Sequence, residues 1–250
     1  MHAFMVHLRK CLFLRKKQED AIGVINVRDV KENLAFIQGQ IAEACERSGR
    51  NPEHIHIVAV TKYVSAERAA EALEAGIQNL GENRDDGLLA KWEVLKDKPL
   101  WHFIGTLQSR KVRNIIDKVE YIHSLDRMSL AKEINKRADK RIKCFIQVNV
   151  SGEESKHGLQ PENTVEFIQK LEPYKNIEVI GLMTMAPYTD DEEVLRTCFR
   201  RLRNLKEEVE GLGLRHAPCH ELSMGMSNDY KIAIEEGATF VRIGSALVGE

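Results

Sequence analysis

Short apolar runs alternate with helical segments along most of this chain, and no other feature constrains its fold as much. The runs predicted to be strands are residues 55–60, 77–80, 100–104, 121–125, 144–150, 179–185, 221–224 and 240–243. Strands that alternate with helices pair in parallel through right-handed crossovers. Eight such units favour a closed (β/α)8 TIM barrel of the α/β class over an open, doubly wound sheet.

The predicted helices leave one place in the outer ring of this barrel unfilled. Between the strands, helical patterns cover residues 66–75, 88–95, 109–117, 127–138, 164–171, 192–210 and 228–236. The segment 27–50 precedes the first strand and repeats apolar residues at helical spacing, so we expect it to complete the ring. No linker composition divides the chain, and residues 25–250 are predicted to form a single domain.

The charge balance argues against nucleic acid and membrane surfaces as partners. Lysine and arginine number 37 against 38 acidic residues, which gives a formal net charge of -1 and no strong field for a polyanion. No apolar run approaches the roughly 20 residues that span a bilayer. The five cysteines are widely spaced without a C-x-x-C pair, which is typical of reduced thiols in a cytoplasmic protein and predicts no metal site.

Residues 1–24 have a different character from the rest of the chain. Arg9 and Lys10 interrupt the apolar residues of this segment, and no small-residue cleavage site follows, so a secretory signal peptide is not expected. We expect a disordered or dispensable extension, and a transit peptide is the alternative.

Lys62 directly follows the first predicted strand, at the end of the barrel where active sites of this fold lie. A lysine that ends a buried strand can lose solvation, which favours the neutral amine. The neutral amine condenses with an aldehyde to form a Schiff base. The alternative is a lysine whose side chain extends from the barrel mouth into solvent.

Two segments near the C-terminus suit a phosphate group. Residues 223–227 lead into a predicted helix with Ser227 as its N-cap, and exposed N–H groups at a helix start attract anions. Gly244 and Ser245 follow the last strand and offer further donors. Phosphate sites in these barrels are often built from the loops after strands seven and eight. Ordinary capping and turn formation is the alternative for each segment.

Arg242 lies between apolar residues, which is unusual for a charged side chain. We expect it to point into the barrel mouth towards a ring nitrogen or an anion, and a structural ion pair with a carboxylate is the alternative. His102 and His123 lie in predicted strands and are expected to be core histidines. The chain contains no H-E-x-x-H, G-x-S-x-G, P-loop or G-x-G-x-x-G motif.

Several motifs then occur in a characteristic order. They are Ala59-Val60-Thr61-Lys62, Gly81-Glu82-Asn83, Trp101-His102-Phe103-Ile104-Gly105-x-Leu107-Gln108, Gly181-Leu182-Met183, Leu222-Ser223-Met224-Gly225-Met226-Ser227-x-Asp229 and Val241-Arg242-Ile243-Gly244. Together they resemble the pyridoxal 5'-phosphate (PLP) homeostasis protein family, over residues 27–249. The resemblance implies a fold similar to the N-terminal barrel of alanine racemase, the fold-type III arrangement, with PLP as cofactor.

The resemblance also implies roles for individual residues. Lys62 would hold PLP as a Schiff base, Arg242 would lie near the pyridine nitrogen, and Asn83 would lie beside the cofactor. The phosphate would be bound by Ser223, Ser227, Gly244 and Ser245, with the backbone of Met224 and Gly225. Because arginine stays protonated, a facing pyridine nitrogen should remain unprotonated, which weakens PLP as an electron sink.

The chain departs from the family pattern in three places. Leu107-Gln108-Ser109-Arg110-Lys111 stands where L-Q-x-N-K is frequent, Val248-Gly249-Glu250 replaces an F-G-x-R ending, and residues 1–24 match nothing in the family. These differences put the ending and the surface around Arg110 in doubt, and leave the PLP site as it is.

Three functions compete. The resemblance implies a cytoplasmic, non-catalytic protein that buffers or delivers PLP, acts as a monomer or weak dimer, and has PLP and apo PLP-dependent enzymes as partners. A fold-type III amino-acid racemase is the alternative, but such enzymes add a second domain that supplies an opposing base, and only Tyr63 and Tyr230 are candidates for that role here. A sugar-phosphate enzyme without PLP would leave the motif matches unexplained.

Overall fold

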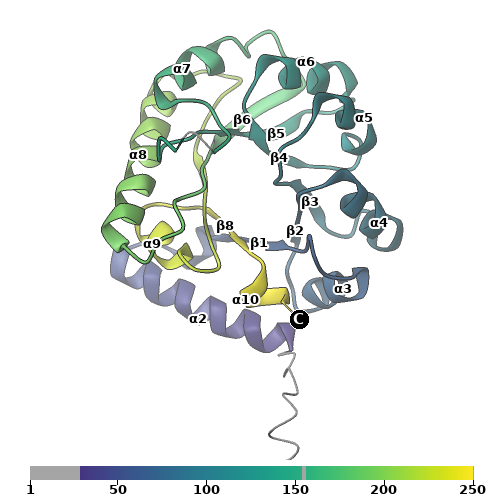
Figure 1. Cartoon of the computed structure of the whole chain (residues 1–250), viewed down its shortest axis with the longest axis vertical. Helices are drawn as coiled ribbons and strands as arrows, with labels where there is room; N and C mark the ends of the chain where they lie inside the picture. Colours follow the sequence, from purple (N-terminus) through teal and green to yellow (C-terminus); the bar gives the residue numbers. More distant parts are fainter. Residues whose placement is uncertain (1–28, 154–155, 250) are drawn as a thin grey trace, which may run out of the picture. The chain divides into compact units, whose positions relative to one another are not determined.

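Eight parallel strands form a closed barrel in the computed structural model, which describes residues 29–153 and 156–249 (Figure 1). Each strand pairs with the next, and β1 also pairs with β8, as the alternating pattern predicted. The strands are β1 (His56–Val60), β2 (Asn79–Glu82), β3 (Leu100–Phe103), β4 (Tyr121–Leu125), β5 (Ile142–Gln147), β6 (Ile177–Met183), β7 (Glu221–Met226) and β8 (Phe240–Ile243).

Three strands begin two residues away from the start of the predicted apolar run. β5 and β6 each begin two residues earlier than predicted. The added residues include the charged Lys143 and Glu178, which lie opposite each other in register within the sheet and were not part of an apolar run. β2 begins two residues later and extends two residues further, through Gly81 to Glu82, which is a buried carboxylate. Charged residues hid these strand ends from a reading based on apolar runs.

Helices surround the barrel (Figure 1). They are α2 (Val30–Ser48), α3 (Ala66–Glu74), α4 (Asp85–Leu95), α5 (Val112–Ile115), α6 (Met128–Arg137), α7 (Pro161–Gln169), α8 (Glu192–Gly211), α9 (Tyr230–Glu235) and α10 (Ser245–Val248), with 3-10 turns η1 (Pro52–His54) and η2 (Ser109–Lys111). Ser65 and Asp191 cap α3 and α8 by accepting backbone N–H bonds. The predicted helix 109–117 is instead the short pair η2 and α5, and α10 was not predicted.

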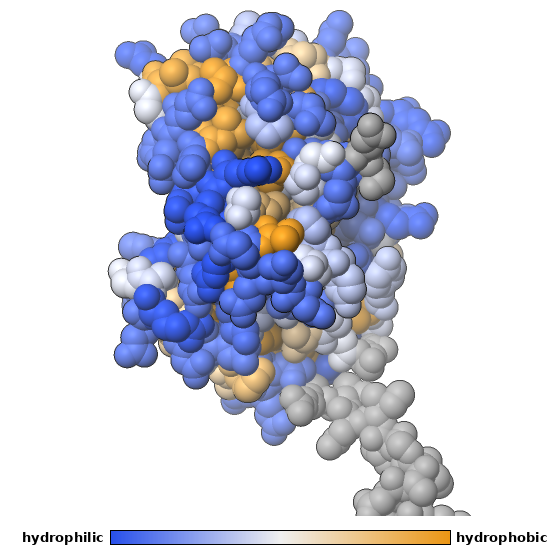
Figure 2. Space-filling model, turned by 60° about the vertical axis from the view of Figure 1, so that its left-hand side comes forward, coloured by the Kyte–Doolittle hydropathy of each residue, from blue (hydrophilic) through white to orange (hydrophobic). Residues whose placement is uncertain are grey.

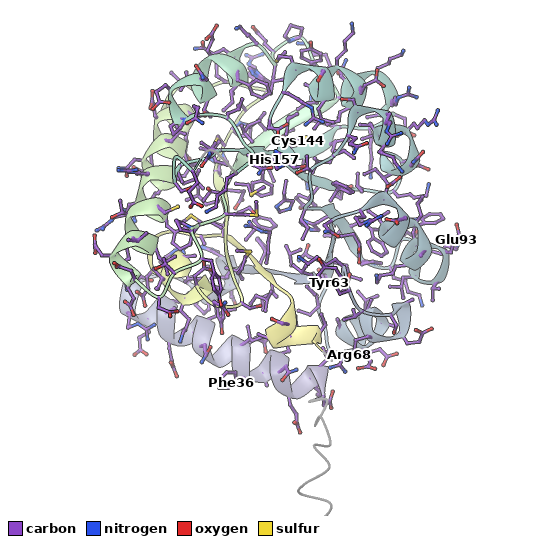
Figure 3. All side chains as sticks on the ribbon, viewed as in Figure 1. Phe36, Tyr63, Arg68, Glu93, Cys144 and His157 are labelled. Carbon is purple, nitrogen blue, oxygen red and sulfur yellow. The ribbon has the colours of Figure 1, made fainter. Side chains whose placement is uncertain are left out.

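The helix α2 completes the outer ring, as expected from its position before β1. Its apolar stripe is buried, and the opposite face carries Phe36, which is 62% exposed and points away from the barrel in Figure 3. Asn33 Nδ2 donates to the Leu247 carbonyl at 3.0 Å, and Arg50 Nη1 donates to the Ile234 carbonyl at 2.6 Å. α2 therefore joins α9 and α10, from the other end of the chain, to the rest of the barrel.

The barrel interior is filled by side chains from opposite strands. Val58, Tyr121, Phe145, Met183 and Phe240 form a buried apolar cluster there, separate from the larger apolar layer between strands and helices. A barrel of eight strands has room for such layers and for no wider channel. The interior is therefore a packed core, and ligands have access only at its ends.

The surface agrees with the mixed charges of the sequence. Hydrophilic residues predominate on the side that Figure 2 shows, and apolar residues form separate patches there. Within residues 29–153 and 156–249, no helix is long and apolar enough to cross a membrane. The predicted extension 1–24 lies outside the described residues, and Val30–Gly249 form one compact unit.

Candidate functional site

The segments singled out in the sequence lie in or directly after four neighbouring strands, β7, β8, β1 and β2. Because β1 pairs with β2 and β8, and β8 pairs with β7, the segments after these strands lie side by side at one end of the barrel. The fold therefore brings Lys62, Asn83, the end of β7 with Ser227, and the end of β8 with Gly244 and Ser245 to one mouth.

Lys62 lies in a turn after β1, and its side chain is exposed. The Thr61 N–H donates to the Gly81 carbonyl at 3.0 Å, which ties the start of the turn to β2. Lys62 Nζ lies 4.9 Å from the centroid of the Tyr63 ring, which is 84% exposed (Figure 3). The expectation that the protein itself desolvates this amine is therefore not met, because the buried strand ends before Lys62 and the side chain extends beyond it.

A buried carboxylate supports the start of this turn. Glu82 ends β2 and is fully buried, and its Oε1 accepts a hydrogen bond from the Thr61 hydroxyl at 2.6 Å. The same oxygen lies 3.0 Å from Nζ of Lys91, a buried lysine of α4, while Oε2 has no hydrogen-bond partner among the described residues. Breaking a buried ion pair is costly, so Glu82 joins the end of β2 both to α4 through Lys91 and to the residue after β1 through Thr61.

Asn83 is half-buried and packs closely against the loop after β3. A Cβ atom at Gly105 would lie 2.2 Å from the Asn83 carbonyl oxygen. Only glycine permits this approach, so Gly105 supports the position of Asn83, a role that sequence reasoning did not assign.

Arg242 is a buried cation on β8, the strand that pairs with β1, and is only 5% exposed. Its Nη1 donates to Ser223 Oγ at 2.6 Å, and its Nη2 donates to the Thr184 carbonyl at 2.8 Å. Burial lowers the pKa of Arg242 to about 10, and the charge of Asp229 opposes this effect. None of the ion pairs among the described residues involves Arg242, so the alternative of a structural ion pair is not what the structure shows.

Ser223 lies inside the barrel and not in the loop after β7. It is fully buried, opposite Met183 and Phe240 in register, and three residues before the end of the strand. Its hydroxyl lies 2.6 Å from Arg242 Nη1 and 2.8 Å from His123 Nδ1. This geometry places Ser223 with Arg242, and does not support the expectation that it binds phosphate.

The loops after β7 and β8 are joined to each other. The Gly244 N–H donates to Ser227 Oγ at 3.3 Å, and exposed Ser245 follows at the start of α10. A hydroxyl that accepts one hydrogen bond can still donate its own hydrogen. Both loops therefore present hydroxyl groups at the mouth, as the phosphate hypothesis requires.

Asp229, and not Ser227, fixes the turn between β7 and α9. The Met226 N–H donates to Asp229 Oδ1 at 2.5 Å, and α9 begins only at Tyr230, so the predicted N-cap at Ser227 is wrong. Burial raises the pKa of the Asp229 carboxyl. Gly225 has φ +91°, and a Cβ there would lie 2.6 Å from Ala233 Cβ, so the turn requires glycine.

A chain of hydrogen bonds continues from Ser223 into the barrel. His123 Nε2 lies 2.9 Å from His102 Nδ1, and His102 Nε2 lies 3.0 Å from Asn79 Oδ1. Both histidines are fully buried, as predicted, and burial lowers the pKa of His102 to about 3 and that of His123 well below its ordinary value. Both rings are therefore neutral. Their connection to Arg242 was missed, although inward-facing polar residues in successive strands were a visible signal.

The remaining candidates do not add to the mouth. The Tyr230 hydroxyl bonds to Gln40 of α2, so this phenol lies in the outer ring. No group of histidine, cysteine or acidic side chains in the described part of the chain could hold a metal ion. Cys45, Cys144, Cys198 and Cys219 are free and buried, and Cys11 lies outside the described residues.

Comparison with known proteins points to one family. The family model described as alanine racemase, N-terminal domain, matches residues 32–250. A pyridoxal phosphate homeostasis protein of Aquifex aeolicus is 45% identical over 226 residues, which cover 88% of this chain and 97% of that protein. A protein of the same name from Pseudomonas aeruginosa is 38% identical over 224 residues, which cover 88% of this chain and 95% of that protein.

Solved structures agree with these relatives. PipY of Synechococcus elongatus with PLP bound superposes with a TM-score of 0.78 at 30% identity, covering 88% of this chain and all of that one. An alanine racemase of Clostridium difficile superposes with a TM-score of 0.70 at 17% identity, covering 88% of this chain and 56% of the racemase. The racemase likeness shows the shared barrel fold alone.

Proposed function

This chain belongs to the pyridoxal phosphate homeostasis proteins, which share the alanine racemase N-terminal domain, and from that premise we propose that it binds PLP and takes part in PLP homeostasis. The single observation that carries the proposal is the convergence of an exposed amine, two joined loops and a buried cation at one barrel mouth. When bound, PLP supplies an aldehyde, a phosphate and a pyridine ring, one for each of these three groups.

We assign covalent attachment to Lys62. Its amine is open to solvent, so an incoming aldehyde can reach it without movement of the barrel. Lys62 Nζ would hold PLP through the aldehyde carbon, with the carbonyl oxygen leaving as water. Buried Glu82, itself paired with Lys91, accepts a hydrogen bond from Thr61 directly before Lys62, so the turn that carries the amine is anchored at its start. Asn83 lies in the next segment, where we place it beside the ring.

We assign the phosphate to the loops after β7 and β8. Ser227 and Ser245 offer hydroxyl groups, and Gly244 lies between the ends of β8 and α10. Met224 has a buried side chain, so Met224 and Gly225 would contribute backbone groups only. Ser223 is removed from this set, since its hydroxyl is bonded to Arg242.

We assign the pyridine nitrogen to Arg242. The guanidinium can donate but cannot accept a hydrogen bond, so the nitrogen that faces it has to be unprotonated. An unprotonated ring withdraws electrons weakly, which suits carriage of the cofactor better than catalysis that needs a strong electron sink. Tyr63 lies beside Lys62 in the same turn and Tyr230 bonds to Gln40 of α2, and these positions support carriage over a mechanism with an opposing phenol base.

We propose further that the protein acts in the cytoplasm as a monomer or weak dimer, and delivers PLP to apo PLP-dependent enzymes without ordinary turnover. An exposed attachment lysine supports delivery, because a partner can approach it. The alternative, an amino-acid racemase, requires a second base at the mouth.

Absorbance spectroscopy tests the binding proposal. We expect added PLP to give the wild-type protein a band in the visible range that borohydride removes, with the label fixed on the peptide that contains Lys62. Lys62→Ala should lose the band and the label. Lys140→Ala is the matched control, because Lys140 pairs with Glu120 just before β4 and lies far from the mouth in the fold. A wild-type protein that stays colourless at saturating PLP would contradict the proposal.

Amino-acid turnover tests the alternative. The PLP-loaded protein is incubated with L-alanine, and the D-isomer is measured. Carriage predicts no conversion beyond the rate of free PLP. Conversion at roughly 1 per second or faster would establish a racemase and contradict the proposal that the protein carries PLP without ordinary turnover.

A further inference from the structure

The strongest unexplained feature is a polar chain inside an otherwise apolar barrel. Asn79, His102, His123, Ser223 and Arg242 come from β2, β3, β4, β7 and β8, and consecutive members lie 3.0, 2.9, 2.8 and 2.6 Å apart. The interior of these barrels is usually filled by branched aliphatic residues. Burying polar groups costs free energy unless each one is hydrogen-bonded, and none of these side chains has an unpartnered buried atom.

The hydrogen positions in this chain follow from its two ends. Arg242 can only donate, so Ser223 Oγ accepts and its own hydrogen is left to donate to His123 Nδ1. A neutral imidazole with an accepting Nδ1 carries its hydrogen on Nε2. His123 Nε2–H then donates to His102 Nδ1, and His102 Nε2–H donates to the oxygen of Asn79. All bonds therefore point the same way, from Arg242 to the first residue of β2.

This direction matters because Arg242 has neutral acceptors and no bonded carboxylate. Aligned hydrogen bonds polarise one another, so each donor along the chain makes the oxygen next to the guanidinium a better acceptor. The titratable groups around the chain of hydrogen bonds are Asp229, whose carboxylate bonds to the Met226 N–H, and His56 and Lys143 at the opposite end. The charge of Arg242 is therefore not neutralised by a direct ion pair among the described residues, although the nearby Asp229 carboxylate raises its pKa.

We propose that His123, through Ser223 and with His102 behind it, is a positioning residue that orients the Arg242 guanidinium towards the ring nitrogen of the bound cofactor. The proposal rests on the proposed PLP site. It assigns a function to two histidines that would otherwise be core residues, and it explains why Ser223 is turned away from the phosphate loops.

Nitrogen-15 NMR of the imidazole rings tests the chain without any cofactor. We expect both His102 and His123 to be neutral with the hydrogen on Nε2 between pH 5 and pH 9. His216, which bonds to the Ile168 carbonyl through Nε2 outside the chain, is an internal reference for the same tautomer. A hydrogen on Nδ1 of either buried ring, or a charged ring in this range, would overturn the proposal whatever the protein binds.

Substitutions test the action on the ligand. In His123→Leu we expect PLP to bind roughly 10- to 100-fold more weakly, the effect of disturbing one hydrogen bond to a charged group, with a shifted absorbance maximum, while borohydride still fixes PLP on Lys62. His123→Asn keeps an acceptor near the position of Nδ1 and should restore most of the affinity and the maximum. Tyr121→Phe is the control, because its ring stacks on His102 at 4.1 Å and its hydroxyl lies outside the chain.

The outcomes separate this proposal from the proposed function. Wild-type affinity and spectrum in His123→Leu would overturn the positioning role and leave PLP binding intact. Equal losses in His123→Leu and His123→Asn would also overturn it, since a structural role predicts no rescue. Absence of PLP binding in the wild type would refute the proposed function. The NMR measurement would still show whether the hydrogen bonds from Arg242 to Asn79 have the direction described above. Ser223→Ala, with the same expected loss, replaces His123→Leu if that variant does not fold.

Discussion

The two sides of the barrel mouth are built in opposite ways. On the side of β1 and β2, the group proposed to react is the exposed Lys62, and the buried ion pair of Glu82 and Lys91 lies behind it. On the side of β7 and β8, the charged group itself, Arg242, is buried and bonded to neutral acceptors. In the proposed site, attachment would thus depend on a group that is open to partners, whereas recognition of the ring would depend on one that is held by hydrogen bonds within the protein.

The largest effect should come from removing the support on the Lys62 side. Lys91→Met leaves the Glu82 carboxylate buried with only the Thr61 hydroxyl as its partner. We expect the free energy of unfolding, measured by urea denaturation without PLP, to fall by about 3–5 kcal/mol. The result would show that the open side of the mouth depends on a rigid pair beneath it.

Lys170→Met is the matched control for this change. Lys170 pairs with Glu166 on the surface of α7, where the two side chains are 58% and 66% exposed, so we expect a loss of about 0.5 kcal/mol or less. Similar small losses of stability in both variants would show that the buried Glu82–Lys91 pair does not support the Lys62 side of the mouth. Glu82→Gln combined with Lys91→Met should recover part of the stability.

A second test concerns the backbone on the Arg242 side. Gly225→Ala places a Cβ at φ +91° and within 2.6 Å of Ala233 Cβ. The strain and the contact together should lower the free energy of unfolding by roughly 2–4 kcal/mol. Gly49→Ala has a similar φ of +67° with no atom within 4 Å, and should cost only about 1 kcal/mol. Equal costs would mean that the turn between β7 and α9 has room to adjust.

A third test concerns the pH dependence of stability, to which Asp229 contributes on the Arg242 side of the mouth. Burial raises the pKa of Asp229, so the folded state binds this proton more tightly than the unfolded state does. Its contribution to stability is therefore present at low pH, and is lost as the pH rises from the ordinary value of 3.8 through the raised one. The contribution of Asp229 to the free energy of unfolding should accordingly be more favourable in acid than at neutral pH.

Asp229→Asn keeps an acceptor for the Met226 N–H and cannot ionise. We expect the stability of the wild type relative to this variant to decrease with rising pH across that window, by about 1.4 kcal/mol if the folded and unfolded pKa values of Asp229 differ by one. Denaturation at several pH values measures this. A relative stability that increases with pH would mean that the carboxyl is stabilised in its charged form, against the burial described here.

The smallest effect should come from Lys62 itself. Because its side chain is exposed, Lys62→Met should change the free energy of unfolding by less than about 0.5 kcal/mol without PLP. With PLP present, the melting temperature should rise more for the wild type than for the variant, because the variant lacks the covalent link and keeps only the non-covalent contacts proposed at Arg242 and the phosphate loops. A large loss of stability in Lys62→Met without PLP would show that Lys62 supports the fold, although its side chain is exposed and that of Arg242 is buried.

Much of the fold was predictable because it depends on local patterns. Alternation of apolar runs and helices identified eight strands, and the stripe of α2 identified the helix that fills the ring. The end of β2 was missed because the buried charge of Glu82 is satisfied by Lys91, nine residues away on a helix. The helix α10 was missed because four residues carry too little periodicity to detect.

The site was predictable only where a charged residue stands next to apolar residues in the sequence. Lys62 and Arg242 stand out beside apolar neighbours, and their strand ends were correctly placed at one mouth. The partners of Arg242 were not predictable, because Ser223 and His123 are 100 residues apart and meet only when the barrel closes. For the same reason Ser223 was assigned to phosphate from its neighbours in sequence, and not to Arg242 from its neighbours in space.

The helix α2 has a consequence for how this protein folds. Its apolar stripe is covered by α9 and α10, and the Asn33 bond to the Leu247 carbonyl spans 214 residues. Contacts of such long sequence separation slow folding, because the chain between them has to be ordered first. During synthesis α2 leaves the ribosome before every strand, so its partners α9 and α10 are missing until nearly the whole chain has been made, although η1 and α3 follow early. We therefore expect ring closure at α2 to be a late step of folding, and the exposed stripe to be a binding site for chaperones until then.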